Sequence, residues 1–176
     1  MINEESHRHL ERCVALAREA LEAGDDPFGS VLVDGSGEVL QEARNCVVTG
    51  DATEHPELAL ARWAAAHMTP EARARATVYT SGEHCPMCAA AHAWAGLGRI
   101  VFISSSEQLG EWLAQLKAPA SPVRMLPIHA IAPEVVVEGP VTALVDAVRA
   151  LHERRHRTPH NTPHKRVLPF TGSFER

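Results

Sequence analysis

Residues 77–88 read Thr77-Val78-Tyr79-Thr80-Ser81-Gly82-Glu83-His84-Cys85-Pro86-Met87-Cys88. The first four of these side chains are β-branched or aromatic, which predicts a strand over 77–80 followed by a polar loop. Gly96 is a typical helix stop, so the segment from Cys85 to Ala95 is predicted to be a helix. Two cysteines three residues apart therefore lie at the start of a helix that follows a strand.

The rest of the chain alternates between the two kinds of element. Further helices are predicted over 3–23, 54–68, 107–116 and 141–155, and further strands over 30–33, 38–40 and 99–103 and within 123–132, beside a β-rich run at 135–137. Asp34-Gly35-Ser36-Gly37 has the composition of a hairpin turn, so the first two strands are expected to pair antiparallel. The fold class is therefore α/β: a three-layer α/β/α sandwich around a central mixed five-stranded sheet.

Length and composition are those of a single globular domain. The chain has 176 residues, of which 45% are hydrophobic and 22% charged. It has no run of ~18 apolar residues that could span a membrane and no basic-then-apolar leader, so we expect a cytoplasmic location and no membrane partner. In such a compartment, the cysteines are expected to bind metal or do redox work rather than form disulfides.

Charge divides the chain into two parts. Of the 17 basic and 22 acidic residues, seven basic and two acidic lie in 149–176, which leaves ten basic and twenty acidic in the first 148. An acidic body argues against a nucleic-acid partner. We therefore expect a catalytic domain over 1–155 and a basic C-terminal tail over 156–176.

The predicted helix that precedes the cysteines in the sequence also has polar residues near its start, in the motif His55-Pro56-Glu57. His55, Cys85 and Cys88 can together supply three zinc ligands and leave a fourth position open, which is the arrangement of a catalytic Zn²⁺ that lowers the pKa of water from 15.7 to roughly 7. Glu57 lies near enough to carry protons between that water, a ring nitrogen and a departing amine. The pattern predicts a zinc hydrolase that displaces an amine.

Two alternatives remain open at this point. A non-catalytic, structural zinc site would require a fourth protein ligand, such as His84 or Cys46. A redox dithiol of Cys85 and Cys88 would leave His55 and Glu57 unexplained.

Five motifs carry a likeness to a known family. They are Pro27-Phe28-Gly29, Asn45, His55-Pro56-Glu57, Thr80-Ser81-Gly82-Glu83 and Cys85-Pro86-Met87-Cys88. In these motifs and in the order of its elements, the chain resembles the zinc-dependent cytidine deaminase superfamily, and most closely its guanine deaminase and bacterial nucleobase deaminase branch. The resemblance implies deamination of a nucleobase-like small molecule: first guanine, a guanine-like ring or a triazine, and second cytosine or cytidine analogues. The alternative within the superfamily is deamination of adenosine in tRNA.

The resemblance also implies roles for single residues. Asn45 would hydrogen-bond the base, Phe28 would line the pocket, and the backbone near Ser81 would receive the ammonia. His84 stands where this branch usually has proline, and it is either a tolerated loop residue or a substrate contact.

The guanine deaminase branch further implies a homodimer. In that branch the C-terminal segment crosses to the dimer partner and covers the partner's active site, so Phe170 or Phe174 is expected to form part of a lid. The alternative is a tail that packs on its own subunit, far from the zinc site.

Overall fold

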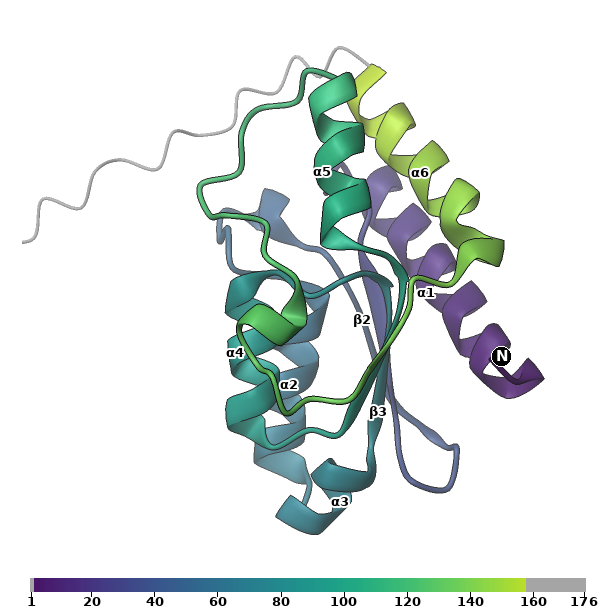
Figure 1. Cartoon of the computed structure of the whole chain (residues 1–176), viewed down its shortest axis with the longest axis vertical. Coiled ribbons are helices and arrows are strands. Elements are labelled where there is room, and N and C mark those ends of the chain that lie inside the picture. Colours follow the sequence, from purple (N-terminus) through teal and green to yellow (C-terminus); the bar gives the residue numbers. More distant parts are fainter. Residues whose placement is uncertain (1, 158–176) are drawn as a thin grey trace, which may run out of the picture.

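The computed structural model describes residues 2–157, which form three layers around one sheet (Figure 1). The five strands have the order β2-β1-β3-β4-β5, with β1 antiparallel to both of its neighbours and β3, β4 and β5 parallel. This confirms the predicted α/β class and the mixed five-stranded sheet. Phe170 and Phe174, which the resemblance assigns to a lid, and all of the tail from 158 onward lie outside the described residues.

The described elements have the following bounds. The strands are β1 (Gly29–Val33), β2 (Val39–Arg44), β3 (Thr77–Gly82), β4 (Arg99–Ser104) and β5 (Val137–Glu138). The α-helices are α1 (Glu4–Glu22), α2 (Pro56–His67), α3 (Pro70–Arg75), α4 (Pro86–Ala95), α5 (Ser106–Gln115) and α6 (Thr142–Arg157), and short 3-10 turns span Val47–Thr49 and Ile128–Ala130.

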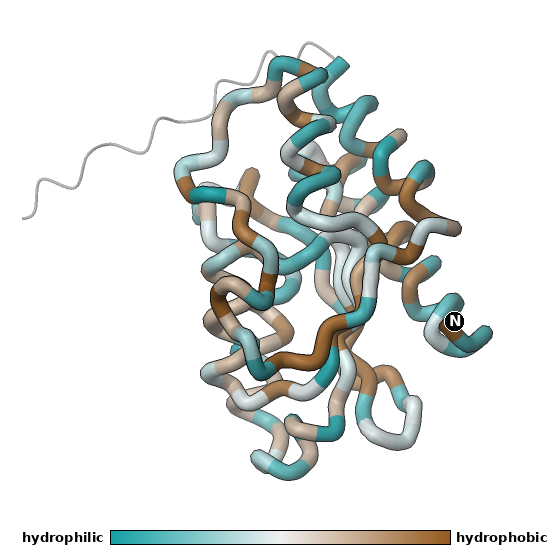
Figure 2. Tube along the Cα trace, viewed as in Figure 1, coloured by the Kyte–Doolittle hydropathy of each residue, from teal (hydrophilic) through white to brown (hydrophobic). Residues whose placement is uncertain are grey.

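The helices cover both faces of the sheet. Helices α1, α5 and α6 pack in one apolar cluster with Val31 of β1, whereas α2 packs in a second cluster with Leu32 of the same strand. The chain alternates between hydrophilic and hydrophobic residues along these helices, as expected where one helix face lies on the sheet (Figure 2). No helix between residues 2 and 157 is both long and apolar enough to cross a membrane.

One local prediction was wrong, and one short helix was not predicted. The strand predicted within 123–132 is absent, and this segment is irregular apart from the 3-10 turn at Ile128–Ala130. Prolines in or beside the segment remove N–H donors that a strand ladder needs: Pro122, Pro127 and Pro133. Thr69-Pro70 does more than end α2, because Thr69 caps the additional helix α3 by accepting a hydrogen bond from the backbone N–H of Ala72 at 3.3 Å.

His152 of α6 packs at the same end of the sheet as the start of α4, where the two cysteines lie. Its side chain is 2% exposed, and its ring centroid lies 5.0 Å from that of Phe28 and 6.2 Å from that of Trp112. Its Nε2 atom has no hydrogen-bond partner within residues 2–157. Burial lowers the pKa of His152 to about 4, although Asp26 acts in the opposite direction.

This burial predicts acid-sensitive stability. An unfolded histidine has a pKa of about 6.5, so between pH 6.5 and about 4 the unfolded chain binds a proton at His152 that the folded chain does not. Stability is therefore complete above pH 6.5 and falls as the pH is lowered, by up to about 3 kcal/mol from this group.

Urea unfolding of the wild type and His152→Phe at pH 7 and pH 5 measures this contribution. We expect a smaller loss of stability in the variant. The other buried histidines, His84 and His92, are present in both proteins and cancel from the comparison. An equal loss in both proteins would show that His152 is not the source.

Candidate metal centre and active site

Three donor side chains meet where α2 and α4 begin. His55 is the N-cap residue of α2, Cys85 is the N-cap residue of α4, and Cys88 lies in the first turn of α4. The Nδ1 atom of His55 is 3.6 Å from the Sγ atom of each cysteine. Cys88 is fully buried, whereas His55 and Cys85 are half-buried, so the group has a side toward solvent.

The spacing of these donors fits zinc. Zinc bonds of about 2.3 Å to sulfur and 2.0–2.1 Å to nitrogen, at a tetrahedral angle, place the two donor atoms about 3.6 Å apart. Both observed nitrogen–sulfur distances have this value. Among the described residues, this is the one group of three His, Cys, Asp or Glu side chains whose ligand atoms all lie within 4.8 Å of one another. Three protein ligands leave a fourth tetrahedral position for water or substrate.

The surroundings favour a thiolate at Cys85. A hydrogen bond from the Cys88 thiol lowers the pKa of Cys85, and His55 acts in the same direction. The same contact raises the pKa of Cys88, so one of the two sulfurs keeps its proton until a cation displaces it. The N-termini of α2 and α4, which both begin at this group, add positive ends of helix dipoles that favour negative charge there.

Glu57 lies beside the donor group and is not a member of it. It is in the first turn of α2 and is 5% exposed, and its Oε1 atom accepts a hydrogen bond from the Thr80 hydroxyl at 3.2 Å. Burial raises the pKa of Glu57. A carboxyl group with a raised pKa can hold or release a proton nearer neutral pH, as general acid–base catalysis requires.

Asn45 is held in a fixed orientation. It is 2% exposed, and its side-chain oxygen accepts a hydrogen bond from the Val47 backbone N–H at 3.2 Å. Its backbone is fixed as well, because its N–H donates to the Phe28 carbonyl at 3.0 Å and its carbonyl accepts from Arg44 at 2.9 Å. Arg44 also pairs at 3.0 Å with the buried Asp25. With its oxygen bound to the loop backbone, Asn45 has its side-chain NH₂ group as the donor that it can offer to a ligand.

Phe28 and Ser81 lie where β1 and β3 meet. A Cβ atom on Gly82 would lie 3.1 Å from the Phe28 ring, so the ring covers the end of β3. The Ser81 hydroxyl accepts a hydrogen bond from the Gly29 backbone N–H at 3.1 Å, and the Ser81 carbonyl accepts one from Ser104 at 3.0 Å.

The two residues considered as a fourth ligand lie outside the donor group. His84 is fully buried, its ring stands edge-on to that of His92 at 5.3 Å, and neither of its ring nitrogens has a partner within the described part of the chain. The Cys46 thiol donates to the Arg44 carbonyl at 3.5 Å. The predicted substrate contact by His84 stays a prediction.

Three residues to which the sequence analysis assigned no role support the site. Thr80 bonds Glu57, and Ser30 bonds Thr80 at 2.9 Å. Glu83 accepts the backbone N–H groups of Ser106 at 2.7 Å and Ile128 at 2.8 Å, which fixes the loop before Cys85. Thr80 and Glu83 belong to one of the motifs that carry the family resemblance, whereas the one sequence signal of Ser30 is a polar side chain inside a strand.

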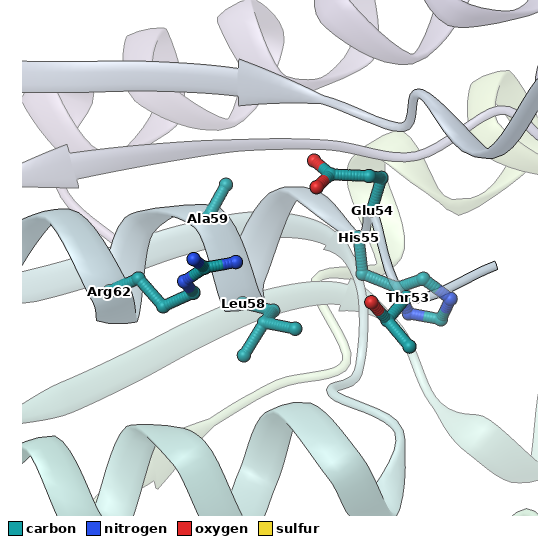
Figure 3. Close-up of a pocket in the computed structure, with 6 residues that line it drawn as sticks. All are labelled: Thr53, Glu54, His55, Leu58, Ala59 and Arg62. Carbon is teal, nitrogen blue, oxygen red and sulfur yellow. The ribbon is translucent and has the colours of Figure 1, made fainter. Parts of the chain in front are cut away.

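A cavity of about 190 Å³ reaches His55 from the surface. Figure 3 shows its lining along the start of α2 and the preceding loop: Thr53, Glu54, His55, Leu58, Ala59 and Arg62. Glu57 and Asn45 are not among these residues. The cavity is therefore an approach to the outer side of His55, whereas Glu57 lies against the sheet.

Comparison with known proteins agrees with this geometry. A model of the MafB19-like deaminase family matches residues 4–141. The chain belongs to this deaminase family. The deaminase class predicted from the sequence is thereby confirmed.

Individual relatives are deaminases of different substrates. A probable cytosine deaminase of Schizosaccharomyces pombe is 34% identical over 61% of this chain and 65% of its own length, so the chain spans less than two thirds of that relative. The solved guanine deaminase of Bacillus subtilis is 29% identical over 72% of this chain and 83% of its own, with a TM-score of 0.53. A mutant of NE0047 in complex with 8-azaguanine, 20% identical, shares the fold with a TM-score of 0.66 over 87% of this chain and 86% of its own.

The donor group predicts that removing one ligand removes the metal. Cys88→Ala should lose zinc and melt at a lower temperature, because the free energy of metal binding stabilises the folded state. Cys46→Ala is the matched control and should keep one zinc per chain. Elemental analysis measures both, and full zinc in Cys88→Ala would contradict the assignment.

Proposed function

We propose that this protein is a zinc-dependent hydrolase that removes the amino group from a nucleobase or a related aminated ring. One observation carries the proposal: a buried carboxyl group with a raised pKa, Glu57, lies beside a three-donor zinc site with room for a fourth ligand. A purely structural site does not require such a carboxyl group.

The chemistry divides between the metal and the chain. When bound by His55, Cys85 and Cys88, zinc would activate water for attack on the ring carbon that carries the amine. Glu57 would take a proton from the attacking water and pass it to a ring nitrogen. It would then take the proton of the newly added hydroxyl group and give it to the amine, which would leave as ammonia while the ring carbon becomes a carbonyl. Because Glu57 is buried, these transfers would be shielded from solvent.

Two residues would position the ring, and a third would bind the ammonia that leaves. The Asn45 NH₂ group would donate to a ring acceptor, and the Phe28 ring would pack on the base. The Ser81 carbonyl would accept a hydrogen bond from the ammonia, in addition to its bond from Ser104.

The substrate is proposed as a free base. Guanine, guanine-like and triazine rings come first, and cytosine or cytidine analogues come second. Both choices are supported by relatives, which include a guanine deaminase and a probable cytosine deaminase. Deamination of adenosine in tRNA is the alternative, and the acidic charge of residues 1–148 argues against it.

Assembly and location are also proposals. A homodimer is expected, with the tail from 156, including Phe170 or Phe174, closing over an active site. The cytoplasmic location expected from the sequence stays a prediction.

Substitution of Glu57 separates chemistry from metal binding. Glu57→Gln should keep its zinc and its fold but lower kcat by about 10² to 10⁴-fold, the contribution typical of a general acid–base group. Glu71→Gln, in the first turn of α3, is the control and should turn over normally. Ammonia release measures both, and near-normal turnover by Glu57→Gln would refute the mechanism.

Substrate size tests the class of substrate. A pocket that closes over a ring should exclude ribose, so free bases should exceed their nucleosides in kcat/KM. An ammonia-release screen over bases, triazines, nucleosides and tRNA ranks them. Faster turnover of a nucleoside or of tRNA than of every free base and triazine would overturn the assignment to free bases.

A further inference from the structure

Two hydroxyl groups interrupt an apolar part of the sheet below the active site. Ser30 of β1 and Thr80 of β3 are directly paired across the antiparallel ladder, and both side chains are fully buried. Two residues along each strand, Leu32 and Val78 belong to the apolar cluster that packs against α2. Burying a hydroxyl group is unfavourable unless it finds a hydrogen-bond partner, so a buried polar pair at this place requires an explanation.

The contacts of the Thr80 side chain explain why this polar pair is buried here. Its Oγ1 atom accepts a hydrogen bond from the Ser30 hydroxyl at 2.9 Å. The same atom lies 3.2 Å from Oε1 of Glu57 and 3.0 Å from the backbone oxygen of Gly82. A hydroxyl group has one proton, and the Ser30 proton already points at Thr80. The Thr80 proton therefore has two acceptors within reach and can satisfy one of them at a time.

We propose that Thr80 is a positioning residue for Glu57: its hydroxyl group donates to Oε1 and fixes the orientation of the carboxyl group. The proposal rests on the proposed function, in which Glu57 carries protons. Ser30 holds the oxygen of Thr80 in place through its own hydrogen bond.

Paired variants of Thr80 test this role. Thr80→Val keeps the shape of the side chain and removes the hydroxyl, whereas Thr80→Ser keeps the hydroxyl. With guanine or cytosine, whichever releases ammonia faster, Thr80→Val should lower kcat by about 10- to 100-fold, the effect of losing a hydrogen bond to a charged group. Its KM, zinc content and melting temperature should remain near those of the wild type, and Thr80→Ser should restore kcat to within about threefold.

A double variant shows whether Thr80 acts through Glu57. If it does, adding Thr80→Val to Glu57→Gln should cause little further loss of the residual turnover. Losses that multiply in the double variant, or a kcat of Thr80→Val equal to that of the wild type, would overturn the proposal. If Thr80→Val loses zinc or unfolds, Ser30→Ala provides the same comparison with a smaller expected loss, and full kcat in Ser30→Ala would then overturn it.

The outcomes also separate this proposal from the proposed function. Normal turnover by Glu57→Gln would refute the deaminase mechanism itself. An inactive Glu57→Gln together with a fully active Thr80→Val would refute only the role of Thr80.

Discussion

The structure depends on one constraint: two helices must begin at the same point, with donor atoms 3.6 Å apart. His55 comes from α2, and Cys85 and Cys88 come from α4, so neither helix can shift along its axis without separating nitrogen from sulfur. The packing of α2 on the sheet through Leu60, beside Leu32 and Val78, keeps the register of that helix. The loop before α4 is fixed by Glu83, which accepts backbone N–H groups from two other segments of the chain.

The same constraint places the acid–base group. Because α2 begins at the metal site, its first turn carries Glu57 to the buried side of the helix, against β3. Burial there raises the pKa of Glu57, and a polar pair in the sheet provides the compensating hydrogen bond. The proposed metal site and the proposed proton carrier are thus two consequences of one helix start, so one short motif would carry most of the proposed chemistry.

Much of this could be predicted from the sequence because it is encoded locally. The spacing of Cys85 and Cys88, with His55 at a second helix start, pointed to three ligands, and the structure brings their donor atoms together. The irregular segment 123–132 was mistaken for a strand because its shape depends on a distant partner, the Glu83 carboxylate, which binds the N–H of Ile128. Thr80 and Ser30 were missed for a similar reason: their pairing follows from the antiparallel register of β1 and β3, which local periodicity does not reveal.

The central claim is that three protein ligands hold one zinc ion and leave a position open. X-ray absorption at the zinc edge of the purified protein measures this directly. The account predicts two sulfur neighbours at about 2.3 Å, one histidine nitrogen at about 2.0–2.1 Å and one further light atom from solvent that a substrate-like inhibitor replaces. A complete shell of four protein ligands that no such inhibitor changes, or a protein that holds no zinc, would contradict it.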